Sequence, residues 1–290
     1  IVGRRSCTCW CGPNYLYPQS CCGKPKLIHQ ATACREARYM ALRRMTTTAS
    51  QLPQDEVHVW TMTVPGDPDT LATFRAVLTG DELARADRFV FARDRHNFSA
   101  ARGALRMVLG FYLGITPQAV VLHYGRHGKP DLAKEFGLRF NLSHAGNWVY
   151  LAFTSACEVG IDVERLRAPG RHSRLDLARR FFSVDEVTHL AALSEARQLE
   201  AFFACWTRKE AYIKLHGRGL TLPLAQFAVS VDPDQPARLE ATPWLPDDLQ
   251  RARLYDLTTA PGYRACLATG STRTLTLQQR PWSAFPPQNS

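Results

Sequence analysis

Two long helical patterns, each followed by short runs typical of strands, constrain the fold of this chain most strongly. Residues 93–114 and 196–216 place apolar side chains at steps of three and four, as an amphipathic helix does. Between and after them the chain alternates β-branched and aromatic runs with Gly, Pro or Asn, which indicates strands. The pattern predicts an α+β fold of two comparable helix-plus-strand halves that meet near residue 155.

The individual elements follow from the same patterns. Asp67 and Asp81 are expected to cap two short helices, and Arg95, Arg102 and Arg106 to lie on the polar faces of helix 93–114. The expected short helices span 66–78, 80–89, 173–182 and 183–193, and the expected strands span 57–61, 120–124, 138–144, 148–154, 158–166, 227–231, 253–259, 263–269 and 274–279.

The positive charge of the chain is concentrated near its start. The formal net charge is +10, but residues 1–44 hold eight Lys or Arg and one acid, whereas the remaining residues hold 28 basic and 25 acidic side chains. A single anion site is therefore expected rather than a broad nucleic-acid surface. No run approaches the roughly 18 consecutive apolar residues of a membrane span. We expect a cytoplasmic protein with neither a nucleic-acid nor a membrane partner.

Cysteines divide the chain at the same place. Cys157, Cys205 and Cys266 stand singly in apolar contexts, as buried reduced thiols do. The other six could form a metal site or disulfides, but they lack the paired C-x₂-C spacing of zinc sites. These six are Cys7, Cys9, Cys11, Cys21, Cys22 and Cys34.

The expected domain boundaries follow from the uneven distribution of charge and of cysteines along the chain. Residues 1–50 are expected to be disordered or not native, with a natural start at Met40 or Met45 as one explanation. The first half is expected to span 51–154 and the second half 155–285, followed by a tail over 286–290.

Two carboxylates on one expected strand are the first sign of a chemical site. Asp162 and Glu164 are two residues apart, so both side chains project from the same face of the strand. Carboxylates held this close repel one another unless a cation lies between them, and Mg²⁺ takes one or two such ligands. Taken alone, the pair is more typical of a half-exposed strand with an acidic face, on which Arg165 and Arg167 would be solvent-exposed partners.

The stretch WTRKEAYIK, residues 206–214, adds a third carboxylate. Glu210 and Lys214 lie one turn apart on a helix with an apolar covering. Alone they would be an ordinary surface ion pair worth a few tenths of a kcal/mol. Beside Asp162 and Glu164, they suit a metal site that takes an anionic substrate.

Candidate anion ligands occur in the first half. Glycine-containing turns bring backbone amides and cationic side chains to a phosphate together. Such ligands are Arg126 and Lys129 in the turn GRHGKP, Ser143 and His144 at a strand end, and Arg93 and Arg95 in FARDR.

Six motifs in order resemble those of the surfactin-type 4′-phosphopantetheinyl transferases, over roughly residues 56–280. The stretch from DEVHVW to helix 93–114 resembles cyanobacterial members. The motifs are GKP (128–130), FNLSHAG (140–146), VGIDVE (159–164), RRFFS (179–183), WTRKEAYIK (206–214) and GRGL (217–220). Residues 1–44 have no counterpart in the family.

The resemblance implies residue roles. It makes Asp162, Glu164 and Glu210 the Mg²⁺ ligands and Lys214 the lysine near the reacting phosphate. Glu210 and Lys214 are the expected catalytic residues: Glu210 is the first candidate to accept the serine proton, directly or through a metal-bound water, and Lys214 is better suited to stabilising the leaving oxygen than to accepting that proton. The resemblance also implies a pseudo-twofold fold with coenzyme A, the co-substrate, in the cleft between the halves. The residues that it assigns to coenzyme A binding are Arg93, Arg126, Lys129, Pro130, Ser143 and His144.

The resemblance also implies the reaction. Family members transfer the phosphopantetheine group of coenzyme A to a serine of an apo acyl or peptidyl carrier protein and release adenosine 3′,5′-bisphosphate. An internal pseudo-dimer makes a monomer the expected state. The alternatives are an inactive protein that binds coenzyme A or a carrier, and a metal-dependent phosphodiester hydrolase, which would leave GKP and NLSHAG without a role.

Overall fold

The computed structural model describes residues 52–167, 173–219 and 222–285. All of them belong to one compact unit, residues 46–290. The expectations for residues 1–50 and for the tail over 286–290 therefore fall outside the described residues.

The first half of this unit runs from β1 to β5. Its elements are β1 (Glu56–Thr63), α2 (Pro68–Ala76), α3 (Gly80–Asp87), α4 (Ala92–Leu113), the 3-10 turn η1 (Pro117–Ala119), β2 (His123–Tyr124), β3 (Pro130–Asp131), the 3-10 turn η2 (Lys134–Phe136), β4 (Arg139–Ala145) and β5 (Trp148–Thr154).

The second half runs from β6 to β10, and a last strand follows it. Its elements are β6 (Val159–Arg165), α5 (Arg174–Phe181), α6 (Val184–Ala192), α7 (Glu195–His216), η4 (Leu224–Gln226), β7 (Ala228–Val229), β8 (Leu239–Ala241), α8 (Asp248–Arg251), β9 (Ala252–Asp256) and β10 (Tyr263–Gly270). The chain then adds β11 (Thr276–Pro281) and η5 (Trp282–Ala284).

The two halves repeat one order of elements. Each has a strand, two short helices, a 22-residue helix, a two-stranded ribbon and two antiparallel strands. In each, the first strand pairs antiparallel with the last, β1 with β5 and β6 with β10. The sheets have the orders β11-β1-β5-β4 and β6-β10-β9. The predicted α+β fold of two similar halves is confirmed.

The same buried ion pair occurs in both halves. In the first, Glu82 on α3 accepts a hydrogen bond from the backbone of Thr79 and pairs with Arg106 of α4 at 2.5 Å. In the second, Glu186 on α6 accepts from the backbone of Ser183 and pairs with Lys209 of α7 at 2.8 Å. Each basic group also donates to the first carbonyl of the 3-10 turn that follows, η1 or η4, and to the carbonyl of the residue directly after that turn. A capping-box glutamate thus fixes the long helix in each half.

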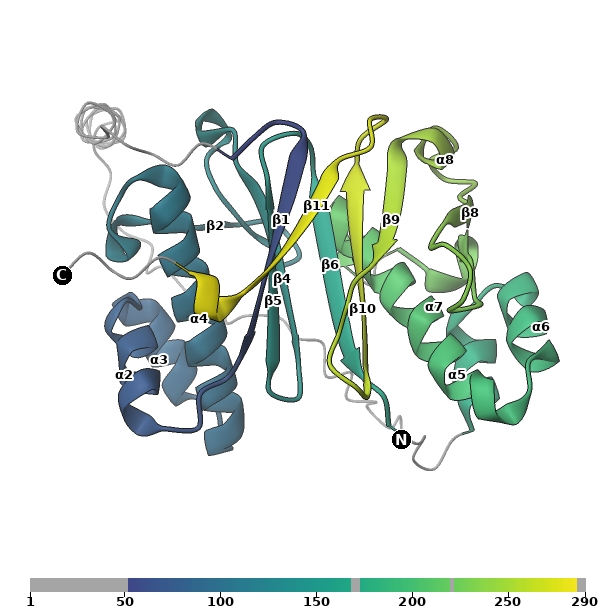
Figure 1. Ribbon diagram of the computed structural model, residues 1–290, viewed down its shortest axis with the longest axis horizontal. Coiled ribbons are helices and arrows are strands. Elements are labelled where there is room, and N and C mark those ends of the chain that lie inside the picture. The colour runs from purple at the N-terminus through teal and green to yellow at the C-terminus, as the bar shows by residue number, and fades with distance from the viewer. Residues whose placement is uncertain (1–51, 168–172, 220–221, 286–290) are drawn as a thin grey trace, which may run out of the picture. The chain divides into compact units, whose positions relative to one another are not determined.

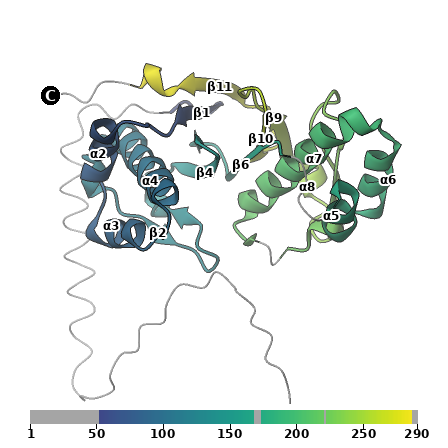
Figure 2. The ribbon, with the colours of Figure 1, turned by 90° about the horizontal axis from the view of Figure 1, so that it is seen from below.

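The sheets lie between two layers of helices (Figures 1 and 2). One core packs α2 and α4 on the first sheet, a second packs α5 to α7 on the other sheet, and a third lies where the two sheets face each other. Strand β1 is buried on both faces because Val57 and Val59 reach the middle core while Trp60 and Met62 reach the core under α4.

Helix α4 differs from the amphipathic helix that the sequence predicts. Almost every residue from Asn97 to Tyr112 is buried, including Arg102 and Arg106. The prediction was wrong because Glu82 lies beside both guanidinium groups, which lets two arginines enter the interior.

Smaller predictions were also corrected. Asp67 caps α2 as expected, accepting from the backbone of Thr70 at 2.7 Å, but the cap of α3 is Thr79 rather than Asp81. Only His123 and Tyr124 of the run 120–124 form a strand. Cys205 and Cys266 are buried free thiols as expected, and Cys157 is free and half-buried. None of the helices in the described ranges combines the length and apolar character that a bilayer crossing requires.

Helix α7 packs on β6 without any side chain between them at Gly160. A Cβ atom built there would lie 2.1 Å from the carbonyl oxygen of Ala211 and 2.3 Å from the backbone nitrogen of Leu215. Only glycine permits this approach, so the residue sets the distance between the strand and the helix.

We predict that Gly160→Ala forces α7 away from β6 and lowers the free energy of unfolding by about 1–3 kcal/mol, the usual cost of overpacking. Urea denaturation measures the loss. Gly80→Ala is the matched control because nothing lies within 4 Å of a Cβ atom there, and it should stay within about 1 kcal/mol of wild type. Equal stability of the two variants would contradict the prediction.

Candidate active site

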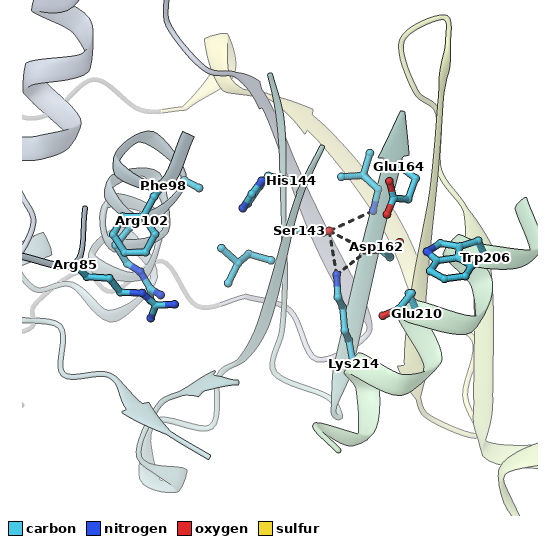
Figure 3. A pocket seen from close by; sticks show the side chains of 13 residues that line it. Arg85, Phe98, Arg102, Ser143, His144, Asp162, Glu164, Trp206, Glu210 and Lys214 are labelled. Carbon is cyan, nitrogen blue, oxygen red and sulfur yellow. Dashed lines mark hydrogen bonds and ion pairs between the residues drawn. The ribbon is translucent and has the colours of Figure 1, made fainter. Parts of the chain in front are cut away.

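Strand β6 and helix α7 form one wall of a pocket of about 490 Å³. Asp162 and Glu164 project into it from β6, and Trp206, Glu210 and Lys214 project from successive turns of α7 (Figure 3). The four-residue spacing places the three helical side chains on one face. The structure thus brings together all three predicted metal ligands and both predicted catalytic residues.

Lys214 is bound to the strands rather than to Glu210. Its Nζ atom lies 2.6 Å from Oδ1 of Asp162 and 3.0 Å from Oγ of Ser143. Ser143 in turn donates to Oδ1 of Asp162 at 3.0 Å and accepts from the backbone of Val163 at 3.4 Å. The interpretation of Glu210 and Lys214 as an ordinary helix ion pair therefore fails.

Burial and mutual repulsion disfavour the ionised forms of Glu164 and Glu210 on this wall. Desolvation, followed by repulsion from Asp162, raises the pKa of Glu164 to about 7. The same two causes, in the same order, raise the pKa of Glu210, and the Lys214 ammonium opposes them. Oδ2 of Asp162 is buried without a hydrogen-bond partner. Lys214 alone therefore does not neutralise the negative charge of this wall, and Oδ2 of Asp162 remains without a donor.

Within the described ranges, no three His, Cys, Asp or Glu side chains already stand in an arrangement that could hold a metal ion. The donor set nevertheless fits a hard cation because all three groups are carboxylates. The free Oδ2 atom of Asp162 and the repulsion that raises the pKa of Glu164 are the two features that a cation would relieve.

Strand β4 lines part of the pocket and contacts strand β6 of the second half. Ser143 and His144 line the pocket at its end, and Oδ1 of Asn141 accepts from the backbone of Ile161 on β6 at 3.0 Å. Desolvation and then the Lys214 ammonium lower the pKa of His144. The imidazole of His144 is therefore neutral and can donate one N–H group to a ligand.

The opposite wall is cationic. Arg85 of α3 and Arg102 of α4 point into the pocket beside Phe98 (Figure 3). Both guanidinium groups lie over the Phe98 ring, at 5.2 and 5.7 Å from its centre. The side chain of Arg102 is only 7% exposed, and its Nε atom lies 3.7 Å from Oε1 of Glu82. Neither Nε nor Nη1 has a hydrogen-bond partner. Buried, unsatisfied guanidinium donors at a pocket wall suit an anion.

The other predicted coenzyme A residues lie outside this pocket. Arg93 is 81% exposed and pairs with Asp94, and Arg126 lies exposed in the turn between β2 and β3, which Pro130 closes. The ammonium group of Lys129 donates to the carbonyls of Lys214 and Val159 at 2.9 and 3.2 Å. It thereby caps the C-terminal end of α7.

Lys129 also lines a second pocket, of about 980 Å³. Tyr124 lines this second pocket as well, and Arg102 of the first pocket lies 5.8 Å from the centre of the Tyr124 ring. Lys214 of the first pocket is followed directly by Leu215 of the second. The two pockets are therefore neighbours.

Arg208 and Lys209 of the stretch WTRKEAYIK do not reach either pocket. Both side chains are fully buried. Arg208 pairs with Asp256 of β9 and donates to carbonyls of the segment that follows β7. The two cations hold α7 in place. Glu210 and Lys214 are the two charged residues of the stretch that line the pocket.

Sequence reasoning missed Arg85, Phe98, Arg102 and Trp206 as pocket residues. Arg102 had a recognisable signal, because it stands alone in the run AARGA, whose small neighbours leave a large charged side chain no reason to be there except a partner. The sequence around Arg85 holds other basic residues and offers no comparable signal.

Comparison with known proteins identifies this arrangement. Residues 158–268 match the family model of the 4′-phosphopantetheinyl transferase superfamily, and residues 64–156 match that of the 4′-phosphopantetheinyl transferase N-terminal domain. The two models divide the chain between β5 and β6, where the two halves meet.

Individual relatives agree with the family models. The 4′-phosphopantetheinyl transferase HetI of Nostoc sp. is 41% identical over 68% of this chain and 86% of its own length. A putative 4′-phosphopantetheinyl transferase of Synechocystis sp. is 33% identical over 68% and 76%, and the transferase Sfp of Bacillus subtilis is 29% identical over 66% and 81%. With these matches and the two-half fold, the chain belongs to the 4′-phosphopantetheinyl transferase family.

Proposed function

We propose that the pocket between the halves transfers the phosphopantetheine group of coenzyme A to a serine of an apo acyl or peptidyl carrier protein. The observation that carries the proposal is the opposition of two walls in one pocket, with carboxylates and Lys214 on one side and the buried guanidinium of Arg102 on the other. An anionic substrate would be held by the cationic wall while its reacting phosphate faces Lys214.

In the proposed reaction, the serine hydroxyl attacks the phosphorus that bears pantetheine. A bond forms between the serine oxygen and this phosphorus, and the bond to the bridging pyrophosphate oxygen breaks. That oxygen leaves with adenosine 3′,5′-bisphosphate. Glu210, whose pKa is raised by desolvation, accepts the serine proton. Lys214 remains protonated and stabilises the leaving oxygen.

Asp162, Glu164 and Glu210 are the proposed ligands of a Mg²⁺ ion. The free Oδ2 atom of Asp162 supports this assignment, because Lys214 binds only Oδ1. A bound Mg²⁺ would neutralise charge on the pyrophosphate during transfer. The protein groups fix the pyrophosphate relative to the serine, since positioning supplies much of the rate of phosphoryl transfer.

The rest of coenzyme A is proposed to extend toward the second pocket. Its position next to Arg102, and Lys129 in its wall, support this placement. Ser143 and His144 lie on the path between the two walls and remain the proposed pyrophosphate contacts. Arg93, Arg126 and Pro130 remain proposed contacts that would have to reach coenzyme A from outside the first pocket.

The first prediction from the proposed function concerns transfer itself. The full chain, incubated with an apo carrier protein, coenzyme A and Mg²⁺, should add the mass of one phosphopantetheine to the carrier, and EDTA should abolish the gain. Glu210→Gln and Asp162→Ala should lower kcat by about 10²–10⁴-fold, the usual contribution of a general base or more.

Glu195→Gln is the matched control for transfer, because Glu195 is exposed on the first turn of the same helix α7. Its kcat should equal that of wild type. Tight binding of coenzyme A without any mass gain would favour the inactive binding protein, and release of adenosine bisphosphate without a carrier would favour a hydrolase.

The second prediction concerns the metal and does not depend on activity. Because desolvation and Asp162 raise the pKa of Glu164 to about 7, a cation beside it should favour the ionised form and lower this pKa by about one pH unit or more. Carboxyl-carbon NMR titration with and without saturating Mg²⁺ measures the change. Glu195 serves as the internal reference, and an unmoved pKa for Glu164 would remove it from the ligand set.

The third prediction concerns the cationic wall. Arg102→Gln removes a buried cation but keeps hydrogen-bonding capacity, so the Kd for coenzyme A should rise about tenfold or more while kcat at saturation changes little. Calorimetric binding measures the Kd. Arg88→Gln, at an exposed position just after α3, should bind like wild type. Equal Kd values for the two variants would disprove the role of Arg102.

A further inference from the structure

Strands β4 and β6 contact each other but belong to different sheets. Strand β4 lies at the end of the order β11-β1-β5-β4, and β6 lies at the end of the order β6-β10-β9. No backbone ladder joins these two described strands, so β6 has an edge without a partner strand. Such an edge leaves a row of backbone N–H and C=O groups that need partners.

Two polar side chains of β4 take the place of a partner strand. Oδ1 of Asn141 accepts a hydrogen bond from the backbone N–H of Ile161 at 3.0 Å, and Oγ of Ser143 accepts from that of Val163 at 3.4 Å. The acceptors are two residues apart on β4, and the donors are two residues apart on β6. At this period side chains return to one face and N–H groups return to one edge, so the two bonds form a regular series.

This arrangement keeps the backbones of the two strands apart at the pocket. Directly paired strands lie about 4.7–4.9 Å apart, whereas here a side chain stands between the two backbones. The pocket opens at the same junction, since its wall includes residues 142–144 of β4 and residues 162–164 of β6. Backbone pairing between these stretches would close part of the pocket. The two acceptors are therefore spacers as well as hydrogen-bond partners.

Asp162 lies between the two residues that β4 holds. The N–H groups of Ile161 and Val163, on either side of it, are both bound to β4. Its Oδ1 atom also accepts from Ser143 at 3.0 Å (Figure 3). Asp162 thus takes its position from the first half, while Lys214 reaches it from α7 of the second. A change in the spacing of the strands would move the carboxylate relative to Lys214.

Asn141 differs from Ser143 in having no contact with the pocket. Asn141 is 5% exposed and lines neither of the two pockets described above. Within the motif FNLSHAG, Ser143 and His144 have proposed roles in the site, whereas Asn141 has none so far. A buried amide oxygen bound to one backbone N–H group can act on the site only through the strand that it holds.

We propose that Asn141 is a positioning residue of the transfer site. Its side-chain carbonyl holds β6 at a fixed distance from β4 and thereby fixes Asp162, with its free Oδ2 atom, for the cation that the site would bind. This inference rests on the proposed transfer reaction. Loss of a group that holds a metal ligand in place typically costs about 10–100-fold in metal affinity or activity, and a displacement of about 1 Å can cost about 100-fold in rate.

Three variants of the full chain test this role. Asn141→Leu and Asn141→Ala remove the acceptor, whereas Asn141→Thr retains a hydroxyl acceptor of the kind that Ser143 supplies. The acceptor-free variants should lower kcat about tenfold or more, raise the Kd for Mg²⁺ about tenfold, and leave KM for coenzyme A within about twofold, because Asn141 touches no substrate. Asn141→Thr should regain most of the loss. Steady-state kinetics and calorimetry measure these quantities.

The hydrogen bond itself can be observed independently of catalysis. Amide-proton NMR should show the Ile161 signal moving upfield in the acceptor-free variants and staying near its wild-type position in Asn141→Thr. Any folded variant in which the Ile161 bond and kcat do not change together would overturn the positioning role. The test therefore needs only one of the three variants to fold.

Thr154→Val is the matched control. Thr154 is a fully buried residue of β5 whose hydroxyl donates to the carbonyl of Glu56 at 3.0 Å, and it lines neither pocket. Its replacement removes a buried bond to the backbone of a neighbouring strand but no bond to β6. The control should lose stability in urea while it keeps wild-type kcat, Mg²⁺ affinity and Ile161 signal. An equal loss of kcat in the control would overturn the inference, because general loosening of the core would then explain it.

Failure of the transfer reaction can be told apart from failure of this inference. Mg²⁺ calorimetry and the Ile161 signal need neither a carrier protein nor turnover. A wild-type chain that binds Mg²⁺ but transfers nothing would overturn the proposed function, and a weaker Mg²⁺ affinity of Asn141→Leu would still support the role of Asn141. An unchanged Mg²⁺ affinity in that variant, with the Ile161 signal shifted, would overturn it.

Discussion

The ion pair between Asp162 and Lys214 is the contact on which the site depends. Asp162 is 4% exposed, and a buried carboxylate without a partner would cost several kcal/mol. Lys214 reaches it at 2.6 Å from a different element. It can do so only because α7 lies directly on β6 at Gly160, where the strand has no side chain. One tertiary contact therefore sets both the stability of this wall and the direction in which Glu210 faces.

Helix α7 divides its charges between structure and chemistry. Arg208 and Lys209 are fully buried and bind partners that do not line the pocket. Desolvation offsets much of the attraction within these buried pairs, so their main effect is to fix the rotation of the helix about its axis. Glu210 and Lys214 consequently face β6 and Ser143 rather than each other. The stretch WTRKEAYIK, which resembles a surface helix in sequence, is thus a mostly buried helical segment with two charged side chains in the pocket.

The sequence carried enough local information for the elements and the carboxylate wall, because period-two and period-3.6 patterns place Asp162, Glu164 and Glu210 on definite faces. The sequence did not indicate which carboxylate or carbonyl group each buried charge would contact. The burial of Arg102 depends on Glu82, 20 residues earlier, and the position of Lys129 depends on carbonyls more than 80 residues later in α7. Such pairings arise from packing between elements, and no spacing rule within one segment reports them.

A difference between the two similar halves explains why the described residues form one such wall rather than two. Both halves keep the capping-box glutamate and its buried cation, Arg106 or Lys209, so the common frame holds each long helix in the same way. Helices α4 and α7 have equal length, and aligning their starts places Met107 and Phe111 of α4 where α7 has Glu210 and Lys214. The first half thus has apolar side chains at the reactive positions. It offers Arg102 to the shared pocket instead, so one side of the pocket carries arginines and the other carries carboxylates.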